Sequence, residues 1–97
     1  MEYNFEWDPI KARINERKHG VRFEDAATVF KDPGALTLFD TKYDEAEERW
    51  ITMGMIGTMC ICVVHHTFRE AFEERILIRI FSARKATKKE QQQYREK

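Results

Sequence analysis

From about residue 35 onward, apolar and polar residues alternate with the period of two that is typical of β-strands. The clearest stretch runs from Arg75 to Phe81, where isoleucine occupies every even position and Arg79 lies on the opposite parity. Three other stretches show strand character, and they cover residues 36–40, 47–54 and 59–68. Short turns separate these stretches, so we expect four strands that pair as an antiparallel meander.

A strand and a helix are expected ahead of this region. Aromatic residues alternate near the N-terminus and predict a half-buried strand, and they lie at positions 3, 5 and 7. Asp8 and the proline after it are typical of a helix start, because aspartate accepts hydrogen bonds from free amides and proline has no amide to satisfy. Gly20 is typical of a helix end. We therefore expect a helix over residues 9–18, with Ile10 and Ile14 turned inward.

Two more helices follow from local signals. The second has apolar residues at helical spacing, and these are Phe23, Ala26, Ala27 and Phe30. Arg22 gives this helix no side-chain cap. The third is expected over residues 87–96, because Thr87 and Glu90 fit the capping box, in which each side chain bonds the backbone amide of the other. Between Arg79 and this helix we expect a short polar turn, which would bring arginines and free helix amides together as an anion-binding region.

The order of these elements predicts an α+β fold with one strand, two helices, a four-stranded antiparallel meander and a C-terminal helix. The first strand is expected to join the sheet, and the helical pair is expected to pack on one face of it. If the isoleucines at even positions face the helices, Arg79 must face the opposite, less covered side. The chain of 97 residues is enough for one core, so residues 1–97 are expected to form a single domain.

Charge is balanced overall but not along the chain. There are 17 basic and 17 acidic residues, which argues against a general nucleic-acid coat protein. Residues 1–50 carry 8 basic and 12 acidic side chains, whereas residues 51–97 carry 9 basic and 5 acidic ones. Such a molecule can attract a polyanion with one side and a basic partner with the other, although a charged C-terminal helix is often no more than a solvated surface.

Nothing in the sequence predicts export or membrane insertion. The longest apolar run, residues 59–64, is too short to cross a bilayer, and the acidic N-terminus lacks the features of a signal peptide. We therefore expect a cytoplasmic protein in which Cys60 and Cys62 stay reduced. No metal site is expected, because Cys60, Cys62 and His66 lie along one extended strand that cannot wrap around a tetrahedral ion.

Several stretches of the chain match, in order, those of a known family. The matching positions are residues 5–11, 18–21, 23–26, 29–30, 32–33, 48–49 and 79–86, together with Asn15, Gly54, Glu90 and Tyr94. As a set they resemble the BrnT toxins of bacterial type II toxin–antitoxin systems, over nearly the whole chain. The chain departs from the family at Arg22, where serine or threonine is usual, and at Phe81, where an aliphatic residue is preferred. The adjacent His65 and His66 are also less typical of the family.

The resemblance implies a RelE-like fold and a ribonuclease that stops translation by cutting RNA, free or on the ribosome, through metal-free transesterification. It also implies a BrnA-type antitoxin that neutralises the toxin and binds operator DNA, so that the toxin reaches DNA only through this partner. No cofactor is implied. The alternative is a non-catalytic module that grips nucleic acid or a partner with the same basic surface, since the same arginines serve both functions.

Five residues are candidates for catalysis. Arg79 and Arg84 suit stabilisation of a phosphorane, because arginine pairs with phosphate oxygens and keeps its charge. The alternative is that Arg79 is an ordinary solvated strand residue and Arg84 a surface residue next to a helix start. His19 is a candidate acid or base, and Lys18 can hold phosphate or exchange protons. These two residues can equally serve only to complement the negative end of their helix. Tyr94 suits stacking on a base or donation from its hydroxyl, although a lone aromatic residue on a helix more often belongs to the core.

Further basic residues are candidates for RNA binding, and they are Lys11, Arg49, Arg69, Lys85 and Lys88. Arg49 and Arg69 suit phosphate contacts and ion pairs with nearby glutamates equally well. His65 and His66 are adjacent on a predicted strand and point to opposite faces of it. At most one of these two histidines can therefore join a site on the open face.

Overall fold

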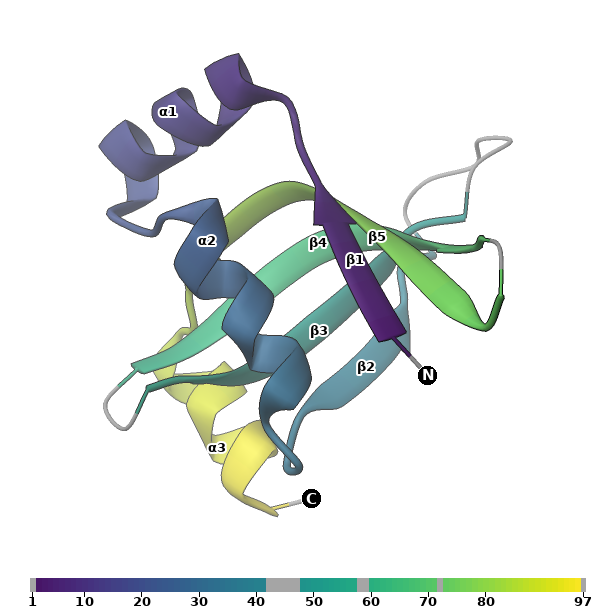
Figure 1. Ribbon diagram of the computed structural model, residues 1–97. Helices are drawn as coiled ribbons and strands as arrows, with labels where there is room; N and C mark the ends of the chain where they lie inside the picture. Colours follow the sequence, from purple (N-terminus) through teal and green to yellow (C-terminus); the bar gives the residue numbers. More distant parts are fainter. Residues whose placement is uncertain (1, 42–47, 58–59, 72, 97) are drawn as a thin grey trace.

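The computed structural model describes residues 2–41, 48–57, 60–71 and 73–96 of the chain. Figure 1 shows its elements, which are β1 (Glu2–Glu6), α1 (Pro9–His19), α2 (Phe23–Ala26), the 3-10 helix η1 (Ala27–Lys31), β2 (Leu36–Phe39), β3 (Trp50–Ile56), β4 (Cys60–Glu70), β5 (Arg75–Lys85) and α3 (Lys88–Glu96). Residues 47 and 59, where two predicted strands begin, lie outside the described residues. None of the helices in this part of the chain has the length and apolar character needed to span a bilayer.

The strands form one five-stranded sheet in the order β1-β5-β4-β3-β2. The strands from β2 to β5 pair antiparallel with their neighbours in sequence, which confirms the predicted meander. β1 joins the sheet beside β5 and runs parallel to it, with Phe5 opposite Ile78 and Glu6 opposite Arg79. The predicted α+β fold is therefore confirmed.

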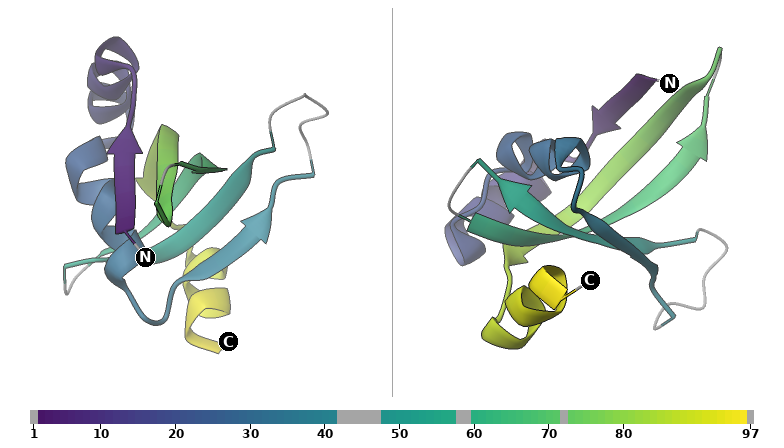
Figure 2. Two further views of the ribbon diagram at one scale, coloured as in Figure 1. Left: turned by 45° about the vertical axis from the view of Figure 1, so that its right-hand side comes forward. Right: turned by 90° about the horizontal axis from the view of Figure 1, so that it is seen from below.

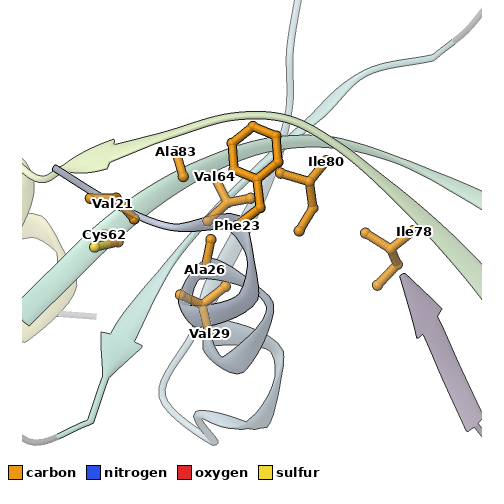
Figure 3. Close-up of a cluster of buried hydrophobic side chains, with 9 residues drawn as sticks. All are labelled: Val21, Phe23, Ala26, Val29, Cys62, Val64, Ile78, Ile80 and Ala83. Carbon is orange, nitrogen blue, oxygen red and sulfur yellow. The ribbon is translucent and has the colours of Figure 1, made fainter. Parts of the chain in front are cut away.

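Helical segments cover both faces of the sheet (Figure 1 and Figure 2). α2 and η1 lie on one face, above the main core. Figure 3 shows the buried members of this core, which are Val21, Phe23, Ala26, Val29, Cys62, Val64, Ile78, Ile80 and Ala83. α3 lies on the other face, where Tyr94 packs beside a second cluster of Met53, Ile61, Val63 and Ala86. Alternate residues of β4 thus contribute to two separate cores.

A shift in register interrupts the pairing of β4 with β5. His66 lies opposite Ile80, whereas His65 lies opposite Ser82, so Phe81 is left over between them. Phe81 is the additional residue of a β-bulge, a device that re-aims side chains and increases the local twist of a strand. We refer to this position as the bulge of β5.

The bulge changes which residues of β5 face the main core. Before it the core residues are Ile78 and Ile80, and after it the core residue is Ala83, so the parity is reversed. With this adjustment the strand continues through Lys85. The short polar turn expected between Arg79 and the last helix was therefore wrong, because the polar residues after Phe81 continue the strand beyond the bulge.

Both long helices begin as their sequences predict. The carboxylate of Asp8 accepts a hydrogen bond from the amide of Ile10 at 2.8 Å, and α1 ends at Gly20, whose φ is 70°. The capping box of α3 is confirmed as well. The amide of Thr87 donates to Oε1 of Glu90 at 2.8 Å, and the amide of Glu90 donates to Oγ1 of Thr87 at 3.2 Å.

α1 lies along the edge of β5, and this position overturns one prediction. Ile10 and Ile14 are 60% and 58% exposed, so their expected burial was wrong. The side of α1 that meets the rest of the protein carries Ala12 and Asn15 instead. A helix at a sheet edge can turn a polar side chain inward, because the edge strand offers unpaired backbone groups as partners.

Asn15 is buried and fixes α1 to β5. Its Nδ2 donates to the carbonyls of Ala83 at 2.8 Å and Val21 at 3.1 Å, and its Oδ1 accepts from the amide of Ala83 at 3.1 Å. β1 stops opposite Arg79. The side chain of Asn15 therefore takes the place of a neighbouring strand along the next part of the edge.

Candidate functional site

A groove of about 210 Å³ lies between α1 and the bulge of β5. The residues that line it are Lys11, Ile14, Asn15, Lys18, His19, Phe81 and Ser82. Positions three and four apart on a helix lie on the same side, which is why α1 presents several polar groups to one groove. The structure thus brings together Lys11, Lys18 and His19, which were selected from the sequence, beside Phe81 and Ser82 of β5.

Phe81 connects the groove with the residues before β3. The guanidinium of Arg49 lies over the ring of Phe81, with its Cζ 4.3 Å from the ring centroid. This is a cation–π contact. An aromatic ring beside a guanidinium suits a nucleotide, because the ring can stack on a base while the cation attracts a phosphate. Arg49 therefore reaches the edge of the groove from the position just before β3.

Arg79 faces the side of the sheet opposite α2, as the alternation predicts, because Ile78 and Ile80 on either side of it point into the main core. Its Nη1 lies 3.4 Å from Oε1 of Glu6, and the Arg79 side chain is 38% exposed. Solvent weakens an ion pair at such a position. A phosphate that offers two oxygens can therefore compete for this guanidinium, two residues before Phe81 on the same strand.

His65 and His66 point to opposite faces, as their adjacent positions predict. His66 is buried, its Nε2 lies 2.6 Å from Oγ1 of Thr52, and burial lowers its pKa to about 4. His65 lies opposite Ser82, and its Nδ1 is 3.7 Å from Oδ2 of the buried Asp40. Burial lowers the pKa of His65 too, while Asp40 acts in the opposite direction. A neutral His65 can accept a proton at pH 7.

Arg84 is engaged at the junction of β5 and α3. Its Nη1 and Nη2 donate to the two carboxylate oxygens of Glu90 at 2.7 and 2.9 Å. This bidentate pair raises the pKa of Arg84 and lowers the pKa of Glu90 to about 2. Since Glu90 also completes the capping box, Arg84 ties the end of β5 to the first turn of α3. A phosphate contact by Arg84 would require this pair to open.

The Arg84–Glu90 pair should make stability depend on acid pH. Folding lowers the pKa of Glu90 from 4.5 to about 2, so its stabilising effect is present above pH 4.5 and is lost as the pH falls through 2. Between pH 5 and pH 2 the wild type should lose roughly 1–2 kcal/mol more unfolding free energy than Glu90→Gln, with allowance for solvent screening. Urea unfolding at both pH values measures this difference, and equal losses would contradict it.

Tyr94 is not among the residues that line the groove. Its hydroxyl donates to Oδ2 of Asp32 at 2.5 Å, and the same carboxylate accepts from the amides of Met55 and Gly34, each at 2.8 Å. The hydrogen bond to Asp32 raises the pKa of Tyr94. These contacts tie α3 to β3 and to the segment after η1, which is the structural role that a lone aromatic residue on a helix usually has.

The other basic candidates lie elsewhere on the described surface. Lys85 lines a separate hollow of about 410 Å³ beside α3. Arg69 is exposed near the end of β4, opposite Leu77 of β5, and Lys88 is exposed at the first position of α3. None of these three side chains, all within the described part of the chain, lines the groove.

Sequence reasoning missed two residues of the groove. Asn15 was noted only as part of a family pattern, because its hydrogen bonds to Ala83 join positions 68 apart in the chain. Phe81 was noted as the end of a predicted strand and as a departure from that pattern but not as a site residue, although an unusual aromatic residue beside a basic stretch is a signal for stacking on a base. Phe81 is itself the bulged residue of β5, and Asn15 bonds to Ala83, which lies two residues beyond it.

The two cysteines of β4 lie side by side as free thiols. Cys60 and Cys62 are free, with their Sγ atoms 3.5 Å apart, and burial raises the pKa of Cys62 to about 12. Cys62 is therefore a protonated core thiol at neutral pH. Across residues 2–41, 48–57, 60–71 and 73–96, no group of three or more His, Cys, Asp or Glu side chains is placed to hold a metal ion.

Comparison with known proteins gives both a structural likeness and a family. The crystal structure of the Brucella abortus ribonuclease toxin BrnT is similar, with a TM-score of 0.61 and 20% identity over 91% of this chain and 100% of that one, which shows a shared fold. A comparison with curated proteins gives no match. The family described as the ribonuclease toxin BrnT of type II toxin–antitoxin systems matches residues 7–90. Because this match spans most of the chain, the resemblance found in the sequence is confirmed, and the chain belongs to the BrnT family of ribonuclease toxins.

Proposed function

We propose that the protein is an endoribonuclease whose RNA site is the groove between α1 and the bulge of β5. The observation that carries the proposal is the convergence of cations from separate elements around Phe81, with Lys11 and Lys18 from α1 and Arg49 from the residue before β3. A phosphate backbone with stacked bases is the ligand that such an arrangement suits. Cleavage of RNA at this site would inhibit translation.

The proposed reaction is a transesterification within the RNA strand. The 2′-hydroxyl oxygen attacks the adjacent phosphorus, the bond to the 5′ oxygen breaks, and the products carry a 2′,3′-cyclic phosphate and a 5′-hydroxyl. The step needs a base for the attacking hydroxyl, an acid for the leaving oxygen and positive charge for the phosphorane. Side chains can supply all three, so the proposed reaction is independent of metal ions.

The residues in and beside the groove can divide these tasks. Lys11 and Lys18 would hold the phosphate, and Arg79 would add charge after leaving its exposed carboxylate partner. His19 lines the groove and is the first candidate for proton transfer. Phe81 would support a base by stacking.

His65 is a second candidate for proton transfer. It lies across the strand pair from Ser82, which lines the groove, and the buried carboxylate of Asp40 lies 3.7 Å from its ring. A carboxylate at this nitrogen favours the tautomer whose other nitrogen accepts a proton. Separate alanine variants of His19 and His65 would show which imidazole the reaction uses.

Two partners follow from this proposal. A type II system includes a protein antitoxin, and we infer that the antitoxin here is of the BrnA type and is the component that binds operator DNA. The described residues that line the groove include no carboxylate that would orient His19. This favours a substrate that the ribosome aligns, because alignment can replace strong acid–base groups. The cytoplasm is the compartment in which both partners would be met.

Cleavage of a short RNA by the purified protein in EDTA tests the proposal. We expect products with a 2′,3′-cyclic phosphate, and we expect no cleavage of the matched 2′-deoxy strand, because it lacks the attacking hydroxyl. Arg79→Ala should cleave at least about tenfold more slowly. The assay is repeated with translating ribosomes. RNA that stays intact in both settings, while it still binds in a salt-dependent manner, would identify a non-catalytic binding module instead.

A further inference from the structure

The outer side of α1 carries an apolar pair that the fold leaves uncovered. Ile10 and Ile14 are 60% and 58% exposed. They are four residues apart, so they adjoin each other on one side of the helix. A contiguous apolar patch on the surface marks an interaction site more often than scattered apolar residues do. We call this pair the Ile10–Ile14 surface.

A basic rim borders the Ile10–Ile14 surface. Helical geometry places Lys11 and Lys18 on one flank of the pair and Arg13 and Arg17 on the other. All four side chains are exposed, and within α1 only Glu16 carries the opposite charge. The outer side of α1 is thus apolar at its centre and positive at its borders.

We propose that the Ile10–Ile14 surface docks an acidic segment of the antitoxin, with apolar side chains on the isoleucines and carboxylates on the basic rim. This inference rests on the proposed function, in which the protein is a toxin with a protein antitoxin. Charge complementarity selects this occupant. RNA would satisfy the rim but leave the isoleucines in water, and a second copy of α1 would bring like charges together.

Docking at this surface would also close the groove. Ile14 lines the groove together with Lys11 and Lys18, so an occupant of the outer side of α1 shares three residues with the proposed RNA site. Carboxylates of the antitoxin would compete with phosphates for the same two lysines. The surface therefore explains neutralisation as direct competition, without a change in the fold of the toxin.

Calorimetric titration of the toxin with the antitoxin protein encoded alongside it tests the inference. The variant Ile10→Asp/Ile14→Asp should bind roughly 30-fold or more weakly, since it places charge at the centre of the interface. The matched control is Leu38→Asp, because Leu38 is 64% exposed and lies on β2 at the other end of the sheet order. The control should bind within about threefold of wild type, and thermal unfolding of each variant verifies folding.

A second variant tests the same surface in case Ile10→Asp/Ile14→Asp does not fold. Arg13→Glu/Arg17→Glu changes only exposed charges of the rim that do not line the groove, and it should weaken antitoxin binding roughly tenfold. Wild-type affinity in both folded variants would overturn the inference. An equal loss in Leu38→Asp would overturn it too, because the effect would then not depend on position.

Two further outcomes would assign the Ile10–Ile14 surface to another occupant and so overturn the inference. The first is self-association of the wild type that the double isoleucine variant abolishes, with antitoxin binding unchanged. The second is a loss of affinity for a 2′-deoxy RNA analogue, again with antitoxin binding unchanged. RNA cleavage by the wild type without antitoxin is measured separately, so failure of the ribonuclease proposal can be told apart from failure of the docking proposal.

Discussion

Replacing Asn15 by alanine should lower the free energy of unfolding by about 3 kcal/mol, which corresponds to a fall of roughly 10–20 °C in melting temperature for a domain of this size. The change removes one hydrogen bond accepted from the amide of Ala83 and two donated to the carbonyls of Ala83 and Val21. Asn15, Val21 and Ala83 are all buried, so water cannot replace these bonds without cost. Thermal and urea unfolding measure the effect.

Ile14→Ala is the matched control, because Ile14 immediately precedes Asn15 on the same helix and is largely exposed. It should change stability by less than about 1 kcal/mol. Asn15→Asp tests the amide donors, since aspartate keeps the size and the acceptor but loses both donors and adds a charge. At pH 7 it should be at least as unstable as Asn15→Ala. If Asn15→Ala and Ile14→Ala lower the free energy of unfolding by the same amount, the hydrogen bonds of Asn15 do not hold α1 against β5.

Much of the fold could be predicted because its signals are local in the chain. Alternation over residues 75–81 identifies a strand from the strand itself. The caps at Asp8 and Gly20, and the box formed by Thr87 and Glu90, depend on residues within a few positions of one another. Such signals survive folding when tertiary contacts do not compete with them.

Other features could not be predicted because they depend on contacts between distant parts of the chain. The bulge at Phe81 breaks the period of two, and the rule of alternation assumes that the period continues. The orientation of α1 was predicted wrongly because apolar character alone selected Ile10 and Ile14 for burial. The side of α1 that carries Asn15 faces inward instead, because Asn15 forms buried hydrogen bonds with the edge of β5.

The candidate site could be predicted in part. Lys11, Lys18 and His19 have suitable chemistry, and the helix that carries them was expected, so their convergence on one groove follows from helical spacing. Arg84 and Tyr94 also have suitable chemistry, but folding gives each a carboxylate partner. The partner of Tyr94 lies 62 positions away in the chain, which no local pattern can reveal.

Replacing Lys11 and Lys18 together by alanine should slow RNA cleavage about 100-fold. Each replacement removes a charge-assisted contact with phosphate that is worth about 1.5 kcal/mol in the transition state. Two such losses correspond to a fall of about 100-fold in rate. Both side chains are exposed, so the variant should keep the stability of the wild type. The matched control, Lys88→Ala/Lys89→Ala, removes the same charge from exposed positions of α3 and should change the rate less than about threefold.

The most direct test of the proposed RNA site compares the rates at which the wild type, Lys11→Ala/Lys18→Ala and Lys88→Ala/Lys89→Ala cleave one RNA. The rates are measured at one salt concentration, under the conditions in which the wild type is active. We predict that the rate of Lys11→Ala/Lys18→Ala alone falls, to roughly one hundredth of the other two. A wild-type rate in that variant would contradict a site between α1 and the bulge of β5. An equal loss in Lys88→Ala/Lys89→Ala would contradict it as well, because cleavage would then follow the net charge of the protein.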